Sequence, residues 1–188
     1  MTASSYKTDT TTTGAASIRN ACALDATAIA ELGAYVFTAT FAHSVQPHEL
    51  QQFLEKSNTT AAIAKDLNDP ARDIIVATNP DGEIIGFAYL TRGSSEPCIA
   101  DVKNLAELQR IYVHPSAHGR GIGSALARKI ESMAREQGFQ NIWLGVWEEN
   151  YPAIKAYQKW GYKKVGSRDF AIGPVVQTDY TMLKELES

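Results

Sequence analysis

The chain has 188 residues, of which 44% are hydrophobic and 21% are charged, the composition of an ordinary water-soluble domain. A formal net charge of −3 argues against a nucleic-acid-binding protein, which normally presents a basic face. No apolar run reaches the roughly 18 residues of a membrane span, and no signal peptide opens the chain. We therefore expect a cytoplasmic protein that has neither nucleic acid nor a membrane as its partner.

Residues 1–16 are rich in threonine and serine and contain almost nothing that could be buried, so we expect a disordered tail. Residues 17–188 are long enough for one domain with a single core. A first strand is predicted at its start, and the apolar spacing of Leu24–Phe37 predicts a helix that Asp25 caps. The two cysteines, Cys22 and Cys98, lack a CxxC spacing and are expected to be buried, reduced thiols.

Residues 37–48 interrupt this helical pattern with aromatic side chains, a histidine and a proline. They predict a connection to two further helices, at residues 49–57 and 60–67. Because aromatic and polar loops often line pockets, Phe37 and Phe41 are candidates for contact with a substrate. A packed surface loop explains the same residues equally well.

The middle of the chain shows alternating strand and helix signals. Two β-rich runs, residues 73–78 and 83–90, flank Asn79-Pro80-Asp81-Gly82 and predict an antiparallel hairpin. A helix is predicted from Ile122 to a terminating Gly138, between two strands that must pair in parallel through a right-handed crossover. Further strands are expected at residues 105–113, 141–147, 162–167 and 177–183, with a short helix from Pro152 to Gly161. The predicted fold class is α/β, with a mixed central sheet and helices on both faces.

A glycine-rich loop, Gly119-Arg-Gly-Ile-Gly-Ser124, joins the strand 105–113 to this helix. Backbone N–H groups of such a loop, together with the positive end of the helix dipole, suit an anion such as a pyrophosphate. A Walker loop requires a Lys-Ser or Lys-Thr pair that is absent here. A dinucleotide-binding fingerprint requires GxGxxG after the first strand, whereas this loop reads GxGxG in mid-chain.

Gly121-Ile122-Gly123 resembles the second half of the acyl-CoA loop Gln/Arg-x-x-Gly-x-Gly/Ala of the GNAT N-acetyltransferases. The resemblance implies the GNAT fold and acetyl-CoA as a cosubstrate, without a metal. His118 stands where glutamine or arginine is usual, which leaves open whether His118 or Arg120 carries the diphosphate charge. The implied donor-binding residues are Ile111, Tyr112, Val113, His118, Gly119, Arg120, Gly121, Ile122, Gly123, Ser124 and Asn150.

A second motif lies thirty residues downstream. Asn150, Ala153, Tyr157 and Gly161-Tyr162 resemble the GNAT motif Asn-x-x-Ala-x-x-x-Tyr-x-x-x-Gly-Phe/Tyr. Two helical turns bring Asn150 and Tyr157 to nearly one face. The resemblance implies that Asn150 contacts the pantetheine arm or an ordered water, and that Tyr157 is the general acid near the thioester sulfur. On its own, a helical tyrosine is more often a core residue.

The general base is less clear from the sequence. Glu107 lies four residues before Ile111, on the strand where several GNAT members carry a catalytic glutamate. Water is an equal alternative, and Glu148 or Glu149 could serve as base or recruit a cationic amine. The resemblance implies direct attack of the amine in a ternary complex, with Ile111 and Val113 pairing with the pantetheine amides.

The acceptor is suggested by a closer likeness. Residues 141–148 and Gln177-Thr178-Asp179 are similar to bacterial spermidine/spermine acetyltransferases, which implies a small primary amine such as a polyamine or an amino sugar. The alternatives are a protein acetyltransferase for lysines or N-termini, and a non-catalytic acyl-CoA-binding regulatory domain. The oligomeric state stays open, with a homodimer as one option.

Overall fold

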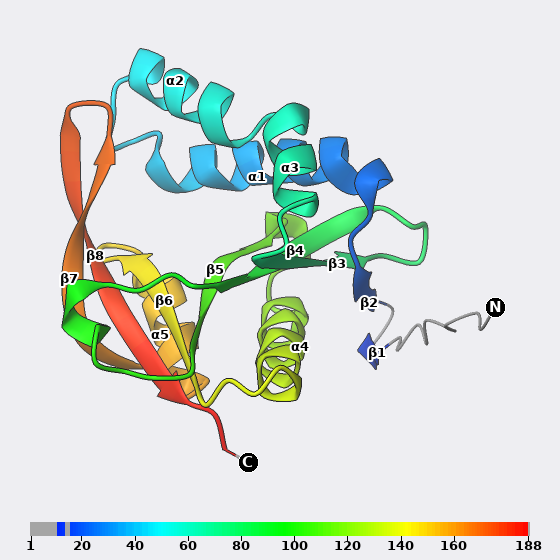
Figure 1. Cartoon of the computed structure of the whole chain (residues 1–188). Coiled ribbons are helices and arrows are strands. Elements are labelled where there is room, and N and C mark those ends of the chain that lie inside the picture. The colour runs from blue at the N-terminus through cyan, green and yellow to red at the C-terminus, as the bar shows by residue number, and fades with distance from the viewer. Residues whose placement is uncertain (1–10, 14–15, 188) are drawn as a thin grey trace.

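The computed structural model describes residues 11–13 and 16–187, in which strands of one mixed sheet follow the order β1-β2-β3-β4-β5-β6-β8-β7 (Figure 1). The strands are β1 (Thr11–Thr13), β2 (Ala16–Asn20), β3 (Arg72–Thr78), β4 (Ile84–Arg92), β5 (Leu105–Val113), β6 (Asn141–Trp147), β7 (Lys163–Ile172) and β8 (Val175–Glu185). The helices are α1 (Ala26–Phe41), α2 (Pro47–Ser57), α3 (Thr60–Leu67), α4 (Ile122–Glu136) and α5 (Tyr151–Lys159). Single 3₁₀ turns lie at Ala23–Asp25, Pro97–Ile99 and Pro115–Ala117.

Helices cover both faces of the sheet, as Figure 1 shows. Helix α1 packs on β4 and β5 from one side, with Ile29 against Phe87 and Tyr89 in one core cluster. Helix α4 packs on the same two strands from the other side, where Leu126 and Ile130 are fully buried. The predicted α/β class, with a mixed sheet between two helical layers, is confirmed.

The middle of the fold follows from local signals in the sequence. In α4, apolar side chains recur at every turn, and Gly138 with φ +85° follows the helix end. Strands β5 and β6 have the predicted bounds and pair in parallel, and the 73–78/83–90 hairpin forms as β3 and β4. These predictions are confirmed.

Helix α1 differs from its prediction at both ends. It continues to Phe41, so Phe37 and Phe41 are helical residues and not part of a loop. The Asp25 carboxylate does not cap α1 but accepts hydrogen bonds from the Arg19 guanidinium and, at 2.8 Å, from the Cys22 backbone N–H. The Arg19 contact lowers the pKa of Asp25 to about 2, so this carboxylate fastens β2 to the turn before α1.

Two expectations for the N-terminal part of the chain need comment. Most of the tail predicted over residues 1–16 lies outside the described residues, but Thr11–Thr13 form β1, which pairs with β2. Cys22 and Cys98 are free thiols as predicted, yet both are exposed, so the expected burial is wrong. None of the helices described is long and apolar enough to cross a membrane.

The sheet splits between β5 and β6. These strands pair only over Leu105–Glu107 and Asn141–Trp143, at their N-terminal ends. Beyond that point β5 stays with β4 while β6 continues with β8. The two halves of the sheet therefore diverge, and the second half of β5 has no strand on its β6 side among the described residues.

Candidate active site

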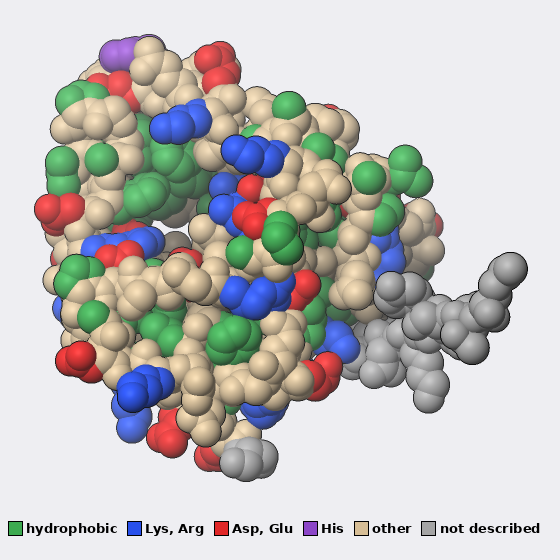
Figure 2. All heavy atoms as spheres, viewed as in Figure 1, with side chains coloured by type: hydrophobic (Ala, Val, Ile, Leu, Met, Phe, Trp, Pro, Cys, Tyr) green, Lys and Arg blue, Asp and Glu red, His purple; other side chains and the backbone are tan. Residues whose placement is uncertain are grey.

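A cleft with a volume of about 1210 Å³ occupies the space where β5 and β6 diverge. Figure 2 shows this face hollowed between the helices above and the β7–β8 ribbon, with hydrophobic side chains inside and charged groups below. We call the part next to residues 119–124 the loop end of the cleft, and the part under α1 and α2 the aromatic end. Every predicted site residue except Arg120 and Glu148 lines this cleft.

The exposed edge of β5 forms one wall. The His114 N–H donates to the Ile85 carbonyl of the β4 side, at 2.8 Å. Backbone hydrogen bonds alternate along an antiparallel strand, so Tyr112 also pairs with β4 whereas Ile111 and Val113 turn their polar groups toward the cleft. Such an edge can accept the amides of an extended ligand as an added strand.

The glycine loop forms the floor at the loop end. Gly119 and Gly121 adopt φ values of +74° and +79°, a left-handed conformation that other residues rarely take. A Cβ added to either would meet no atom within 4 Å, so the space in front of the loop is open. Gly121 is the N-cap of α4, and the unpaired N–H groups of the first helical turn add to those of the loop. This geometry fits a diphosphate.

The side chain of His118 contacts the edge of β5. Its Nε2 lies 3.0 Å from the Val113 carbonyl oxygen, a contact in which the ring N–H donates. The imidazole therefore occupies the Val113 carbonyl, one of the polar groups on the edge of β5. Arg120 is exposed and does not line the cleft, whereas His118 lines it with its ring turned to the Val113 carbonyl.

Helix α5 forms the opposite wall. Asn150 is its N-cap, with the side-chain oxygen accepting the Ala153 N–H at 3.3 Å. Tyr157 lies two turns later, held edge-on by Trp160 and Tyr162 at centroid distances of 5.5 and 6.1 Å. Burial raises the pKa of the Tyr157 hydroxyl, which keeps it protonated and able to donate. Asn150 and Tyr157 face the same cleft, as their spacing predicted.

Glu107 lies where β5 and β6 part. It is only 5% exposed, and burial raises the pKa of its carboxyl. A carboxyl in such an environment is better matched to accepting a proton near neutral pH than a solvated one. Its position between the two halves of the sheet puts it between the loop end and the aromatic end.

Aromatic rings give the far end its character. Phe41 lies 5.2 Å from the Trp147 ring and 6.1 Å from the Phe170 ring, measured between centroids. Phe53 closes the same wall from α2. Phe37 lines the cleft but is 4% exposed, packed in the core between α1, α2 and the β7–β8 hairpin. The wall is thus built mainly by Phe41, with Phe37 as its support.

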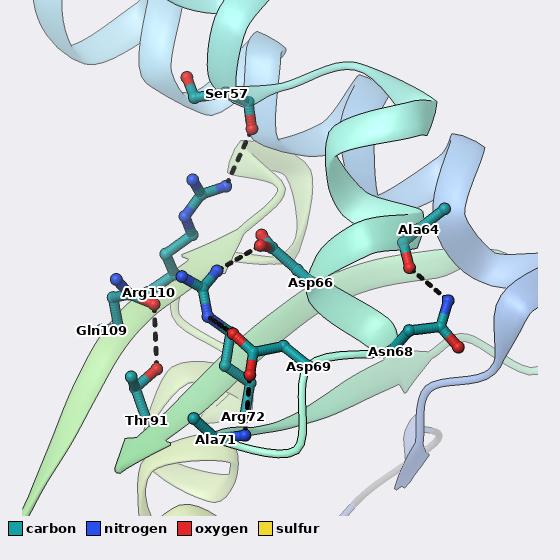
Figure 3. Close-up of polar contacts among 10 residues, drawn as sticks. All are labelled: Ser57, Ala64, Asp66, Asn68, Asp69, Ala71, Arg72, Thr91, Gln109 and Arg110. Atoms are coloured by element: carbon teal, nitrogen blue, oxygen red, sulfur yellow. Dashed lines mark hydrogen bonds and ion pairs between the residues drawn. The ribbon is translucent and has the colours of Figure 1, made fainter. Parts of the chain in front are cut away.

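Figure 3 shows polar contacts of two β5 residues that line the cleft, Gln109 and Arg110. Arg110 reaches from β5 to the Ser57 carbonyl at the end of α2, at 3.4 Å. Beside it, Gln109 accepts the Thr91 hydroxyl at 2.9 Å. The Arg110 bond connects the sheet to α2, and the Gln109 bond connects β5 to β4.

Comparison with known proteins agrees with this geometry. A model of the acetyltransferase (GNAT) family matches residues 37–162, a span that includes the β5 edge, the glycine loop and α5. The chain belongs to the GNAT family. It is, on that ground, an acetyl-CoA-dependent N-acetyltransferase.

Several relatives of this GNAT protein are known. An uncharacterised N-acetyltransferase of Mycobacterium tuberculosis is 35% identical over 162 residues, which cover 86% of this chain and 98% of the relative. Streptothricin acetyltransferase of Streptomyces lavendulae is 34% identical over 48% of this chain and 44% of its own length. PaiA N-acetyltransferase of Thermoplasma acidophilum, solved in complex with coenzyme A, has a TM-score of 0.73 at 20% identity, covering 90% of this chain and 98% of that chain.

One predicted substrate contact of this GNAT protein is not found in its cleft. Glu148 is the first residue after β6, and its backbone N–H donates to the Thr178 carbonyl at 3.0 Å. Glu148 is not among the residues that line the cleft. Its role as an acceptor contact stays a prediction.

Sequence reasoning missed a charged group at the aromatic end. Arg168 of β7 contacts Glu96 at 2.6 Å and Asp179 of β8 at 3.6 Å, and all three line the cleft. Burial raises the pKa of Asp179, against a lowering by Arg168. The only signal in the sequence was Asp179 itself, which was considered only as part of a family likeness.

Proposed function

We propose that this N-acetyltransferase moves the acetyl group of acetyl-CoA to the primary amine of a small molecule, a polyamine or an amino sugar. The observation that carries the proposal is the single cleft in which a free strand edge, a glycine loop, a protonated tyrosine and a buried carboxylate meet.

The loop end suits the donor. Its thioester supplies the acetyl group, and the residues of the chain hold and orient it. N–H groups from Gly119 to Ser124 would bind the diphosphate, and the edge at Ile111 and Val113 would pair with the pantetheine amides. An N–H of that edge is suited to polarise the thioester carbonyl. Asn150 lines the cleft between loop and helix, where the arm would pass.

Two residues are suited to move protons. The acceptor ammonium must lose a proton before its nitrogen can attack, and Glu107 is a buried carboxylate of the cleft that is suited to accept it. As the carbon–nitrogen bond forms and the carbon–sulfur bond breaks, the Tyr157 hydroxyl would protonate the leaving thiolate, and the second proton lost by the amine nitrogen would restore that hydroxyl. The acetyl group passes directly from sulfur to nitrogen, so no enzyme nucleophile is required.

The aromatic end favours a small acceptor. Phe41, Phe53 and Phe170 wall it from three elements, which suits a compact amine better than an extended peptide. A protein acetyltransferase needs an open groove at this position. A regulatory acyl-CoA-binding domain has no use for Glu107 and Tyr157 in the same cleft. Assembly into a homodimer is a separate proposal, which analytical ultracentrifugation tests.

A thiol-release assay with acetyl-CoA separates these functions. The full chain is offered a panel of polyamines, amino sugars, amino acids and lysine peptides. Turnover of a small amine with kcat/KM at least tenfold above the best peptide supports the proposal. Turnover of peptides alone favours a protein acetyltransferase, and binding of acetyl-CoA without turnover of any amine favours a regulatory domain.

A further inference from the structure

The aromatic end of the cleft holds more negative than positive charge. Glu96 and Asp179 line it together with Arg168, Glu107 lies at its border with the loop end, and Arg110 is the second arginine that lines the cleft. The Arg168 guanidinium contacts Glu96 at 2.6 Å but Asp179 only at 3.6 Å. The cleft thus has three carboxyl groups and two guanidinium groups, and Arg110 donates to the Ser57 carbonyl, so the excess of carboxyl groups suits a cationic ligand.

Rigid elements hold this arrangement in position. Arg168 and Asp179 are paired residues of β7 and β8. The guanidinium lies directly over Gly145 of β6, where an added Cβ would come within 2.7 Å of its Nη2. It also lies 5.5 Å from the ring of Trp143. The glycine in β6 thus makes room for the arginine that holds the two carboxylates at the cleft wall.

Two further observations point to a ligand here. Trp143 is 1% exposed and lines the cleft, yet its indole N–H has no hydrogen-bond partner among the residues described. A buried donor without an acceptor is costly, so the wall of the cleft at Trp143 carries an unmet polar group that an acceptor atom of a ligand, though not its ammonium, would satisfy. Burial also raises the pKa of both Glu107 and Asp179, as expected where carboxylates lack full compensation by nearby cations.

We propose that Asp179, with Glu96 and the Arg168 that tethers them, forms an ammonium-binding subsite that selects acceptors carrying a second cationic group besides the amine to be acetylated. This inference rests on the proposed function. The reacting amine would lie toward Glu107 and the second ammonium toward Asp179. The Phe41 and Trp147 rings beside this subsite add the electrostatic attraction of aromatic faces for cations.

The subsite separates the two acceptor classes of the proposed function. A diamine or polyamine carries the second cation, whereas an amino sugar with one amino group does not. A hydrogen bond to a charged group is worth about 1.5–3 kcal/mol, which corresponds to roughly a 10- to 150-fold preference.

Matched acceptors and variants test the subsite. The probes are 1,4-diaminobutane and 1-aminobutane, which share a chain length and differ by one ammonium. We expect wild type to acetylate the diamine with kcat/KM at least tenfold higher. In Asp179→Asn the diamine should lose that advantage while the monoamine changes less than threefold. Asp169→Asn removes an exposed carboxylate from the neighbouring position of β7 and is expected to preserve the preference.

Separate controls test whether each variant is folded and whether the proposed function holds. Thermal stabilisation by coenzyme A shows that each variant is folded, and Glu96→Gln replaces Asp179→Asn if that variant does not fold. Equal turnover of both probes by wild type overturns the subsite and leaves the proposed function standing. If neither probe is turned over, isothermal titration calorimetry in the presence of coenzyme A measures whether the diamine binds. Binding of the diamine that Asp179→Asn abolishes then supports the subsite without the proposed function, and absence of binding overturns both.

Discussion

Aromatic packing fixes the position of Tyr157. The Trp160 and Tyr162 rings contact it edge-on, so its hydroxyl is held in the cleft by shape rather than by a polar network. Because burial raises its pKa, the hydroxyl stays protonated throughout the physiological range. A phenylalanine would keep the packing of the ring and lose only the hydroxyl group.

We therefore expect Tyr157→Phe to lower kcat about 100-fold, within the usual range for loss of a general acid. The KM for acetyl-CoA should change little, because the wall of the cleft keeps its shape. Steady-state kinetics measures both constants. Tyr151→Phe makes the same chemical change at a side chain that is 64% exposed, and it should behave as wild type. A kcat within twofold of wild type for Tyr157→Phe removes this residue from the acid role.

The buried state of Glu107 predicts a pH dependence. Its raised pKa means that the carboxyl holds its proton to a higher pH than a solvated glutamate, whose pKa is about 4.3. A protonated carboxyl cannot act as base, so kcat/KM should fall as pH decreases through this raised pKa. In Glu107→Gln the rate should fall and this acidic limb should disappear from the pH–rate profile. Glu148→Gln, outside the cleft, serves as the control, and an unchanged limb in Glu107→Gln assigns deprotonation to water.

The same shift has a consequence for stability. A carboxyl whose folded pKa lies above its unfolded value costs stability once pH rises above the unfolded pKa. Replacement by neutral glutamine removes that cost. Glu107→Gln should thus be more stable than wild type at pH 7 and should lose this advantage toward pH 4, as urea unfolding at the two pH values would show.

At the scale of elements, helix α4 has a glycine in the left-handed conformation near each end. The two positions have similar backbone geometry, so the same substitution can be compared at both. Gly121 at its start and Gly138 past its end have φ values of +79° and +85°, and an added Cβ meets no atom at either position. Valine at either site therefore brings the same backbone strain, about 1–2 kcal/mol. Only Gly121 lines the cleft.

We expect Gly121→Val to raise the KM for acetyl-CoA at least tenfold, because the loop must change shape and a side chain enters the diphosphate space. Both substitutions should lower the free energy of unfolding by a similar amount, but Gly138→Val should leave the KM for acetyl-CoA unchanged. Kinetics and urea unfolding of both variants measure the two effects. Equal KM values in the two variants would show that the loop does not bind the donor.

How much the sequence could predict differs between elements. Strands β5 and β6, helix α4 and the Asn150–Tyr157 spacing follow from patterns within a few turns of chain. Contacts that the whole fold creates do not. Arg168 and Glu96 are 72 residues apart, and nothing in either segment indicates that they meet. The extension of α1 to Phe41 was missed because tertiary packing of Phe37 and Phe41 outweighs the β-branched residues between them.

At the scale of the whole molecule, the sheet behaves as two halves joined by the few pairs at Leu105–Glu107. The first half presents the β5 edge, and the second presents α5 and the charged residues of β7 and β8. A donor seated on that edge would touch both halves at once, so binding should stabilise the joint between them. This makes the β5 edge a direct reporter of donor binding.

Amide hydrogen exchange followed by NMR measures the protection of each backbone N–H along the edge of β5. The Ile111 and Val113 N–H groups face the cleft, whereas the Tyr112 N–H pairs with β4. In the free protein we expect Ile111 and Val113 to exchange at least 100-fold faster than Tyr112, because a backbone bond protects only the last. Acetyl-CoA should slow Ile111 and Val113 by tenfold or more while Tyr112 changes little. Strong protection of Ile111 and Val113 without ligand would mean that the edge is already paired, and donor binding by strand addition would have to be abandoned.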